Sequence, residues 1–243
     1  MDARDTMINE LLGTMVHVEV DRPLGYRHGD IRYPVNYGYL PGVTSGDGQA
    51  LGAYILGVSE PVVSFDGRVV GAIRRKNDFQ DKLVVAPDGI VFHQGQIAEA
   101  VQFQEQGFDS YIVSLLRKSC GVIPYRITAG RREYLIVFEQ FSKCWSLPKG
   151  HMEAGETETE TAFRELFEES SLTARLDTSR PASTEYFISP VIRKQVVYFP
   201  GLVSGTPRTR EGEIEGFKWV KAEELKNYLF PDTVDACVHL WDE

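Results

Sequence analysis

Residues 149–172 constrain the fold of this chain more than any other stretch. They contain Glu165, Glu168 and Glu169, whose i, i+3, i+4 spacing puts all three on one face of an α-helix. Like charges on one helical stripe repel, so a helix over about 156–170 needs a positive partner at that face. Mg2+ and Mn2+ prefer carboxylate oxygens as ligands, so the sequence predicts a divalent-cation site on this helix.

Composition limits the classes of protein that fit this sequence. Its 243 residues suffice for one large domain or two small ones, and 42% hydrophobic and 25% charged residues are ordinary for a soluble globular protein. The formal net charge of −9 disfavours non-specific binding to nucleic acid through a basic surface. Nucleotides stay compatible as ligands, because a bound cation reverses the sign of the local charge.

The cysteines and the apolar segments predict a cytoplasmic protein. Cys120, Cys144 and Cys237 are odd in number, widely spaced and without a Cys-x-x-Cys motif. This usage predicts a reducing compartment, no disulfide framework and small, buried hydrophobic side chains. The first residues show no signal peptide. No segment approaches the roughly 20 apolar residues of a membrane span, so we expect no membrane partner.

The first half of the chain, residues 1–112, is predicted to form a small β-barrel domain. Short β-type segments follow one another closely between turn signals, and such spacing is typical of a small barrel. These segments lie at 15–20, 53–58, 68–73 and 82–87. Residues 21–48 are rich in Gly, Pro, Asp and Tyr, which predicts turns and short strands. A helix over 97–108 is predicted to end the domain.

The second half, residues 113–243, is predicted to be an α/β sandwich with a mixed sheet. Its expected strands lie at 119–126, 134–138, 183–189, 194–203 and 216–220. The acidic helix over 156–170 separates the second strand from the third, and a last helix is expected to begin at Ala222. Helices that alternate with strands in this way cover the faces of one sheet.

Eight positions of residues 149–172 form a longer pattern, namely Gly150, Glu156, Arg164, Glu165, Leu166, Glu168, Glu169 and Leu172. The pattern resembles the Nudix box, the signature of hydrolases that act on nucleoside diphosphates linked to another group. The resemblance implies an α/β/α Nudix sandwich, phosphoanhydride hydrolysis, and Mg2+ or Mn2+ as cofactor. A solvated acidic helix is the alternative, but it does not explain the Lys-Gly-His loop that precedes it.

Elementary conformational preferences give the box residues separate structural roles. Gly150 and Gly155 are expected to let the loop bend with positive φ. Phe163 and Leu166 are expected to anchor the apolar side of the helix. Ser171 stands where the family has glycine, and a left-handed conformation at a non-glycine residue costs about 1–2 kcal/mol. This departure affects how the helix ends and leaves the cation site intact.

Arg164 is predicted to orient a carboxylate of the box by a bidentate contact. Glu156, near the start of the helix, is its expected ion-pair partner. The resemblance implies that Arg164 acts with Glu165, Glu168 and Glu169 as the catalytic set, in which the three glutamates hold the cation.

The loop before the helix narrows the resemblance. Residues 145–156 read WSLPKGHMEAGE and resemble the Nudix branch that hydrolyses diadenosine tetraphosphate asymmetrically. Lys149 offers a point charge to bridging phosphates, and the family pattern makes its backbone carbonyl a cation ligand. His151 is a candidate phosphate contact, with a surface histidine that caps a loop as the alternative.

A strand near residues 194–198 resembles a substrate-facing strand of the same branch. Lys194 and Tyr198 are four residues apart and therefore lie on one face of a strand. The resemblance implies that both bind substrate, with Tyr198 stacked on an adenine at about 1–3 kcal/mol. A core position for Tyr198 is the alternative.

The resemblance also places a glutamate near the cation from the segment EGEIEGFKW. Glu213 is the candidate, either as an additional cation ligand or as the general base. Glu211 and Glu215 compete for this role. Trp219 matches a position that packs in the family core.

The N-terminal half resembles family I inorganic pyrophosphatases through residues 14–108, most clearly in YPVNYGYLPGVTSGDG. The family binds several Mg2+ ions, but its Asp-Gly-Asp-x-x-Asp run reads Asp-Gly-Gln-Ala-Leu-Gly here. The retained candidates are Glu19, Tyr37, Asp47, Asp78, Asp81 and Lys82. Neutral side chains do not replace carboxylates around Mg2+. We therefore expect this half to lack the full metal site and to act as a scaffold, a dimer surface or a nucleotide-side wall.

The leading hypothesis is a hydrolase that cleaves diadenosine tetraphosphate to ATP and AMP. A second hypothesis keeps the Nudix chemistry but acts on 5′-triphosphate RNA or on nucleoside triphosphates; the negative net charge disfavours RNA without excluding its 5′ end. A third is a non-catalytic nucleotide-binding module, against which the intact glutamate triad argues. The sequence leaves the oligomeric state open, including a homo-oligomer.

Overall fold

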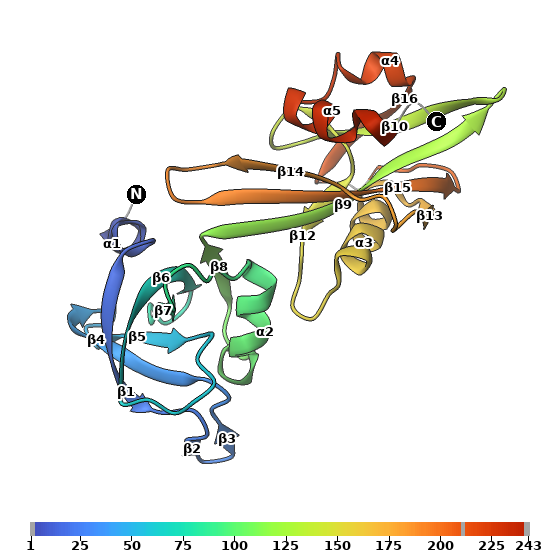
Figure 1. The fold of residues 1–243 in the computed structure, drawn as a ribbon. Helices are drawn as coiled ribbons and strands as arrows, with labels where there is room; N and C mark the ends of the chain where they lie inside the picture. The colour runs from blue at the N-terminus through green and yellow to red at the C-terminus, as the bar shows by residue number, and fades with distance from the viewer. Residues whose placement is uncertain (1–2, 210–211, 241–243) are drawn as a thin grey trace. The chain divides into compact units, whose positions relative to one another are not determined.

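The computed structural model describes residues 3–209 and 212–240. The chain divides into two compact units, Met1–Arg117 with Phe187–Arg193, and Lys118–Tyr186 with Lys194–Glu243 (Figure 1). Each unit contains two clusters of buried hydrophobic residues. Within the described ranges, no helix has the length and apolar character needed to cross a membrane.

A closed β-barrel forms the centre of the first unit, as the sequence predicts (Figure 1). Its strands are β1 (Met15–Arg22), β4 (Asn36–Thr44), β5 (Ala50–Ile55), β6 (Ser64–Arg75) and β7 (Lys82–Ala86). They pair in the order β1–β4–β5–β7–β6, and β6 pairs again with β1 to close the ring. The β5–β7 pair is parallel and the other pairs of the ring are antiparallel.

Shorter elements surround this barrel. They are α1 (Ala3–Leu11), β2 (Arg27–His28), β3 (Ile31–Arg32), α2 (Gln94–Glu105) and β8 (Ser110–Ser114). The strands β2 and β3 form a separate hairpin, and β8 pairs with β6. The sequence did not predict α1. Helix α2 begins at Gln94 rather than Ile97, because the His93 side chain accepts a hydrogen bond from the Gln96 backbone and caps the helix.

The barrel strands bury residues on both of their faces. Leu51 and Ala53 of β5 belong to one cluster, which includes Ile8 of α1. The next residue, Tyr54, belongs to a second cluster, which includes Ile97 of α2. Successive side chains of a strand point to opposite faces, so burial on both faces gives the near-continuous apolar runs seen in the sequence.

The second unit is built on a sheet with strand order β11–β10–β9–β15–β13. In addition, β12 pairs with β9, β14 with β15, and β16 with β10. The strand bounds are β9 (Leu116–Thr128), β10 (Arg131–Glu139), β11 (Trp145–Ser146), β12 (Lys149–His151), β13 (Thr173–Leu176), β14 (Ala182–Phe187), β15 (Arg193–Ser204) and β16 (Ile214–Val220). The helices are α3 (Glu158–Ser170), α4 (Ala222–Leu225), α5 (Pro231–Cys237) and the 3-10 helix η1 (Val238–Leu240).

Helices cover both faces of this sheet and give the three-layer sandwich that the Nudix resemblance implies (Figure 1). Val122, Leu135 and Val197 pack with Leu166 of α3. Their sequence neighbours Ile123, Ile136 and Val196 lie in a different cluster, with Leu225 of α4 and Cys237 of α5. The alternation of a β-strand therefore separates the two cores, and α3 is held on one face of the sheet.

The last predicted helix is split in two. Helix α4 begins at Ala222 as predicted, but it ends at Leu225, and Pro231 begins α5. Proline suits the first position of a helix because its missing N–H group has no intrahelical partner there. The segment between the two helices contains Phe230, which lines a pocket of this unit.

Candidate active site

Helix α3 ends where the sequence predicts and begins at Glu158, two residues after the expected start. Thr157 caps its first turn, and the side chain of Glu160 accepts the Thr157 backbone N–H in return. Glu158 and Glu160 lie in the first turn, where negative charge is favourable. Ser171 ends the helix in the left-handed conformation at φ 59° and ψ 15°. The structure thus keeps the helix ending of the family without its glycine, at a cost of about 1–2 kcal/mol.

The apolar side of α3 differs from the prediction. Leu166 and Ala162 are fully buried, but Phe163 is 42% exposed and Phe167 is 57% exposed. The prediction for Phe163 was therefore wrong. Ala162 and Leu166 are i, i+4 neighbours that face the sheet, whereas Phe163 and Phe167 form an i, i+4 pair on another side of the helix.

The glutamates of α3 meet at a partly buried face where their charges are incompletely neutralised. Burial raises the pKa of the Glu169 carboxyl to about 8, and the charges of Glu165 and Glu139 add to this effect against the opposing charge of Lys149. Burial also raises the pKa of Glu165, to which the charges of Glu168 and Glu213 contribute. A cation at this face would favour the charged form of both carboxyls and so oppose the effects of burial and of like charge on their pKa values.

Arg164 supplies part of the missing positive charge. Its Nε and Nη2 donate to the two carboxylate oxygens of Glu156 at 2.6 and 2.9 Å, as predicted. Its Nη1 donates to Glu165 at 2.7 Å and to Glu168 at 3.3 Å. Nη2 also donates to the backbone carbonyl of His151 at 2.9 Å. Arg164 therefore fixes two carboxylates of the triad and ties the helix to the loop before it.

Gly150 is needed for a reason that differs from the expected one. Gly155 has the predicted positive φ, at 77°, whereas the φ angle of Gly150 is not positive. A Cβ atom at Gly150 would lie 2.1 Å from the Glu165 carboxylate. Any side chain at Gly150 would push Glu165 away, so this glycine keeps the carboxylate against the backbone of β12.

Lys149 and His151 lie on either side of Gly150 in β12. The Lys149 ammonium donates to Glu139 Oε1 at 2.6 Å, and its backbone N–H donates to Glu169 Oε2 at 3.3 Å. His151 is exposed, and its carbonyl accepts from Arg164. Lys149 therefore joins helix α3 to the pocket that opens beside it.

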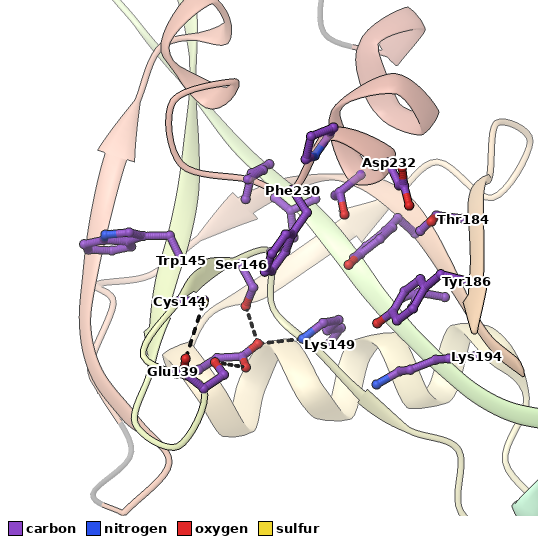
Figure 2. Close-up of a pocket in the computed structure, with 17 residues that line it drawn as sticks. Glu139, Cys144, Trp145, Ser146, Lys149, Thr184, Tyr186, Lys194, Phe230 and Asp232 are labelled. Atoms are coloured by element: carbon purple, nitrogen blue, oxygen red, sulfur yellow. Dashed lines mark hydrogen bonds and ion pairs between the residues drawn. The ribbon is translucent and has the colours of Figure 1, made fainter. Parts of the chain in front are cut away.

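A pocket of about 450 Å³ lies within the second unit. Figure 2 shows Lys149 and Lys194 toward one side of it, with Phe230 and Tyr186 apart from each other on either side of Lys149 and Asp232 at a further wall. Its lining residues are Glu139, Ser142, Cys144, Trp145, Ser146, Leu147, Lys149, Thr184, Tyr186, Lys194, Val196, Tyr198, Leu229, Phe230, Pro231, Asp232 and Thr233.

The predicted strand residues occupy different depths of this pocket. Lys194 and Tyr198 both line it, which agrees with their expected common face of β15. Tyr198 is only 2% exposed and belongs to the core that α4 and α5 cover. The core alternative for Tyr198 therefore fits the structure, because a ring buried in this way offers no free face to a base.

Sequence reasoning missed the exposed aromatic rings of the pocket. Tyr186 is 38% exposed and Phe230 is 63% exposed. Tyr186 lies in β14, which pairs with the strand of Lys194, so the hairpin pattern was an available signal. Phe230 lies between α4 and α5 and had no such signal, since its place depends on how α5 packs on the sheet.

Glu213 stands immediately before β16, next to the carboxylate face of α3. Its charge contributes to the raised pKa of Glu165, and its carbonyl accepts from the Gln140 backbone at 2.8 Å. Its competitor Glu215 forms an ion pair with Lys143 instead. Glu211, the other competitor, lies outside the described residues. Trp219 is partly buried against the core, as expected, with the guanidinium of Arg126 4.0 Å above its ring.

The carboxylates of α3 fit a hard divalent cation by their chemistry. Within the described ranges, no three His, Cys, Asp or Glu side chains already converge as metal ligands. Glu165 and Glu168 instead share Arg164, while Glu169 faces Lys149. Oxygen donors with like charges, partly buried and incompletely neutralised, are a donor set suited to Mg2+ or Mn2+.

The acidic candidates of the first unit are used in a different way. Asp81 is fully buried and forms ion pairs with Arg4 at 2.6 Å and Arg74 at 3.2 Å. Asp78 pairs with Arg75 at 2.9 Å. Of the others, Asp47 accepts the Gln49 backbone N–H, Glu19 lies 3.3 Å from His17, Tyr37 is largely buried and Lys82 is buried. These groups stabilise the barrel, and its likeness to pyrophosphatases stays a prediction.

The cysteines form no disulfide. Cys120 and Cys237 are buried, as predicted, and Cys144 is partly buried at the pocket. Burial raises the pKa of the Cys120 and Cys237 thiols to about 12, so both behave as small hydrophobic side chains.

Comparisons with known proteins agree with this site. The NUDIX domain family matches residues 117–236. The "Putative 8-oxo-dGTP diphosphatase" of Bacillus subtilis is 28% identical over 102 residues, which are 42% of this chain and 66% of that protein. The asymmetrical bis(5′-nucleosyl)-tetraphosphatase of Caenorhabditis elegans is 39% identical over 57 residues, 23% of this chain and 41% of that protein. The chain thus spans only part of the length of each curated relative.

Among solved structures, the binary complex of C. elegans Ap4A hydrolase has a TM-score of 0.48 at 23% identity, covering 51% of this chain and 94% of that chain. The family match covers most of the second unit and includes the acidic helix, Lys149, Lys194 and Glu213. Residues 117–236 of the second unit are therefore similar to the NUDIX domain family, and the match includes the acidic helix.

Proposed function

We propose that this protein hydrolyses a dinucleoside polyphosphate, with diadenosine tetraphosphate giving ATP and AMP as the preferred reaction. The observation that carries the proposal is the continuity between pocket and helix at Lys149. Its ammonium lines the pocket and its backbone N–H contacts Glu169 of α3. A nucleoside in the pocket would thus present its phosphate chain to the carboxylates of the Nudix box.

The pocket has the features of a nucleotide site. Its volume of about 450 Å³ lies in the usual range for small-molecule sites. The exposed rings of Tyr186 and Phe230 both line it and offer two stacking surfaces to a base (Figure 2). Lys149 and Lys194 lie at the end from which the phosphates would leave toward α3. The curated C. elegans relative is named for its action on a bis(5′-nucleosyl) tetraphosphate.

The proposed roles at the helix follow from the contacts of each side chain. Glu165, Glu168 and Glu169 would hold a divalent cation together with the Lys149 carbonyl, and Glu213 would be an additional ligand or the general base. Arg164 keeps Glu165 and Glu168 oriented through its hydrogen bonds. When bound, the cation would neutralise phosphate oxygens and lower the pKa of a coordinated water.

A carboxylate would act as the general base, and the lysines would stabilise the negative charge that develops. A glutamate removes a proton from the attacking water, which adds to a phosphorus atom of the polyphosphate in line with the leaving phosphate. One P–O bond forms and one breaks, and ATP leaves with the released electron pair when the attacked phosphorus belongs to AMP. Lys149 and Lys194 would offset the negative charge that develops on the leaving group. His151 is exposed beside the loop and is proposed as a further phosphate contact.

A substrate panel with product identification tests the proposal. Diadenosine tetraphosphate, diadenosine triphosphate, ATP, 8-oxo-dGTP and a 5′-triphosphate RNA would each be incubated with the protein and Mg2+ or Mn2+, and the products separated by chromatography. We expect ATP and AMP in equal amounts from diadenosine tetraphosphate, and no products with EDTA. Two ADP molecules, or no turnover of any dinucleotide, would contradict the proposal.

A nucleoside triphosphate is the second candidate substrate. The favouring observation is the similarity to the B. subtilis protein over 102 residues, since that protein is described as acting on 8-oxo-dGTP. The same panel separates the two candidates, because a triphosphate substrate would release a nucleoside monophosphate and pyrophosphate. A higher kcat/KM for 8-oxo-dGTP than for diadenosine tetraphosphate would favour this second function.

A further inference from the structure

Lys149 stands between two carboxylates that have different surroundings. Its ammonium donates to Glu139 Oε1 at 2.6 Å, whereas its backbone N–H donates to Glu169 Oε2 at 3.3 Å. The ammonium also acts electrostatically on Glu169, so both carboxylates lie within its influence. A lysine side chain has several rotatable bonds, and its position is therefore set by the partner that holds it.

Glu139 is built to be that partner. It ends β10, and both of its carboxylate oxygens accept hydrogen bonds. Ser146 donates to Oε1 at 2.6 Å and Ser142 donates to Oε2 at 2.7 Å, in addition to Lys149 (Figure 2). Burial alone would raise the pKa of Glu139, but Lys149 and the serine hydroxyls lower it to about 2. Glu139 is outside the Nudix box and no role for it follows from the sequence pattern.

We propose that Glu139 is a positioning residue, which holds the Lys149 ammonium at the nucleotide pocket and keeps it off Glu169. The inference rests on the proposed function, because it takes Glu169 as a cation ligand and the pocket as the nucleotide site. Without Glu139, Lys149 still has Glu169 beside it, which its backbone N–H already contacts. An ion pair between these two would neutralise a cation ligand and withdraw a positive charge from the phosphate end of the pocket.

Two consequences distinguish this role from a structural one. Loss of Glu139 weakens cation binding even when no nucleotide is present, because Lys149 then competes with the cation for Glu169. It also raises KM for diadenosine tetraphosphate at saturating Mn2+, because Lys149 no longer faces the phosphates. A role in folding alone would lower the melting temperature and leave both constants of the folded protein unchanged.

The experiment is a Mn2+ titration of the full chain by calorimetry, without nucleotide. Glu139→Gln is expected to weaken Mn2+ binding by about 10- to 100-fold, the usual effect of losing a residue that orients a metal site. Glu139→Asp should recover most of the affinity, since it restores the charge. The matched control is Glu133→Gln, which removes a carboxylate paired with Arg126 at 2.7 Å and should leave Mn2+ binding unchanged.

A double-mutant cycle with Lys149→Met excludes a simple charge effect. If Glu139 acts by holding Lys149, Glu139→Gln has no effect on the Mn2+ Kd in the Lys149→Met background. An equal loss of affinity in both backgrounds would overturn the proposal, because it would show that only the charge of Glu139 matters. An unchanged Kd in folded Glu139→Gln, or no Mn2+ binding by the wild-type protein, would also overturn it.

A second variant covers the case in which Glu139→Gln does not fold. Ser146→Ala removes one donor to Glu139 and should weaken Mn2+ binding in the same direction; an unchanged Kd would then count against the proposal. Failure of the proposed function gives a different result, namely normal Mn2+ binding with no hydrolysis of diadenosine tetraphosphate. Normal hydrolysis with an unchanged Kd in Glu139→Gln would refute only the positioning role.

Discussion

Two clusters in this molecule each combine arginines with several carboxylates, but they differ in how completely the carboxylates are neutralised. In the barrel, Asp81 pairs with Arg4 and Arg74, and Arg75 pairs with Asp78 and Glu105. On α3, Arg164 serves two carboxylates of the triad, and the pKa values of Glu165 and Glu169 stay raised. A cluster that neutralises itself stabilises a fold, whereas one that stays short of positive charge is suited to bind a cation.

The largest expected effect is on turnover when a carboxylate of α3 is neutralised. Glu168→Gln or Glu169→Gln should lower kcat for diadenosine tetraphosphate about 100-fold or more, because each removes a charge that would stabilise the reacting phosphate through the cation. The far-ultraviolet circular dichroism spectrum should stay unchanged. Steady-state kinetics with Mg2+ check this expectation. Full activity in both variants would show that these glutamates are not ligands of the catalytic cation.

The barrel cluster should respond in stability instead. Asp81→Asn leaves two guanidinium groups without their buried partner, and breaking such a pair costs about 3–5 kcal/mol. Urea denaturation followed by circular dichroism measures the loss. Asp88→Asn is the control, because Asp88 pairs with Arg68 at the surface and its loss should hardly change the free energy of unfolding. Equal stability of the two variants would contradict the contrast between the clusters.

The aromatic pocket gives the next effect. Phe230→Ala and Tyr186→Ala should each raise KM for diadenosine tetraphosphate by about tenfold, because base stacking on an aromatic ring is worth about 1–3 kcal/mol. Tyr198→Phe should leave KM unchanged, since the Tyr198 ring is buried in the core. Initial rates over a range of substrate concentrations separate KM from kcat. A large KM effect in Tyr198→Phe with none in the exposed rings would reverse this assignment.

The raised pKa of Glu169 predicts how stability depends on pH. Without metal, the folded protein keeps this proton up to about pH 8, whereas the unfolded chain loses it near the ordinary glutamate pKa of 4.5. The folded state therefore binds more protons between these values, and the stability of the metal-free protein falls as pH rises through them. Melting temperatures in EDTA between pH 5 and pH 8.5 measure this slope, which Glu169→Gln should reduce. A slope unchanged in that variant would point to other groups.

The smallest expected effect concerns the barrel as an enzyme. In the full chain, the double substitution Glu168→Gln and Glu169→Gln removes the hydrolytic activity expected of the second unit. This variant should release no phosphate from pyrophosphate in Mg2+. The retained acidic groups of the barrel are held in ion pairs and turns, and Gln49 and Gly52 stand where carboxylates would be needed. Phosphate is measured colorimetrically, and robust turnover would show that the barrel keeps a working metal site.

Local rules predicted the acidic helix well because its signals lie within a few residues of one another. The ending of the helix at Ser171 was predicted from neighbouring residues alone, and the Thr157 cap, which was not predicted, also depends only on its neighbours. The ion pair of Arg164 with Glu156 joins residues that are close in the sequence, and it was also predicted. Phe163 was misplaced because hydrophobicity alone does not tell which side of the helix meets the sheet.

By itself, the sequence determined the acidic face of α3. The spacing of Glu165, Glu168 and Glu169 places three carboxylates on one helical face, and that geometry belongs to any α-helix with this pattern. Only the tertiary structure decided that Gly150 makes room for Glu165, that Glu139 holds Lys149, and that Tyr186 and Phe230 line one pocket. These contacts join segments far apart in the chain, and their positions depend on how the helices pack against the sheet.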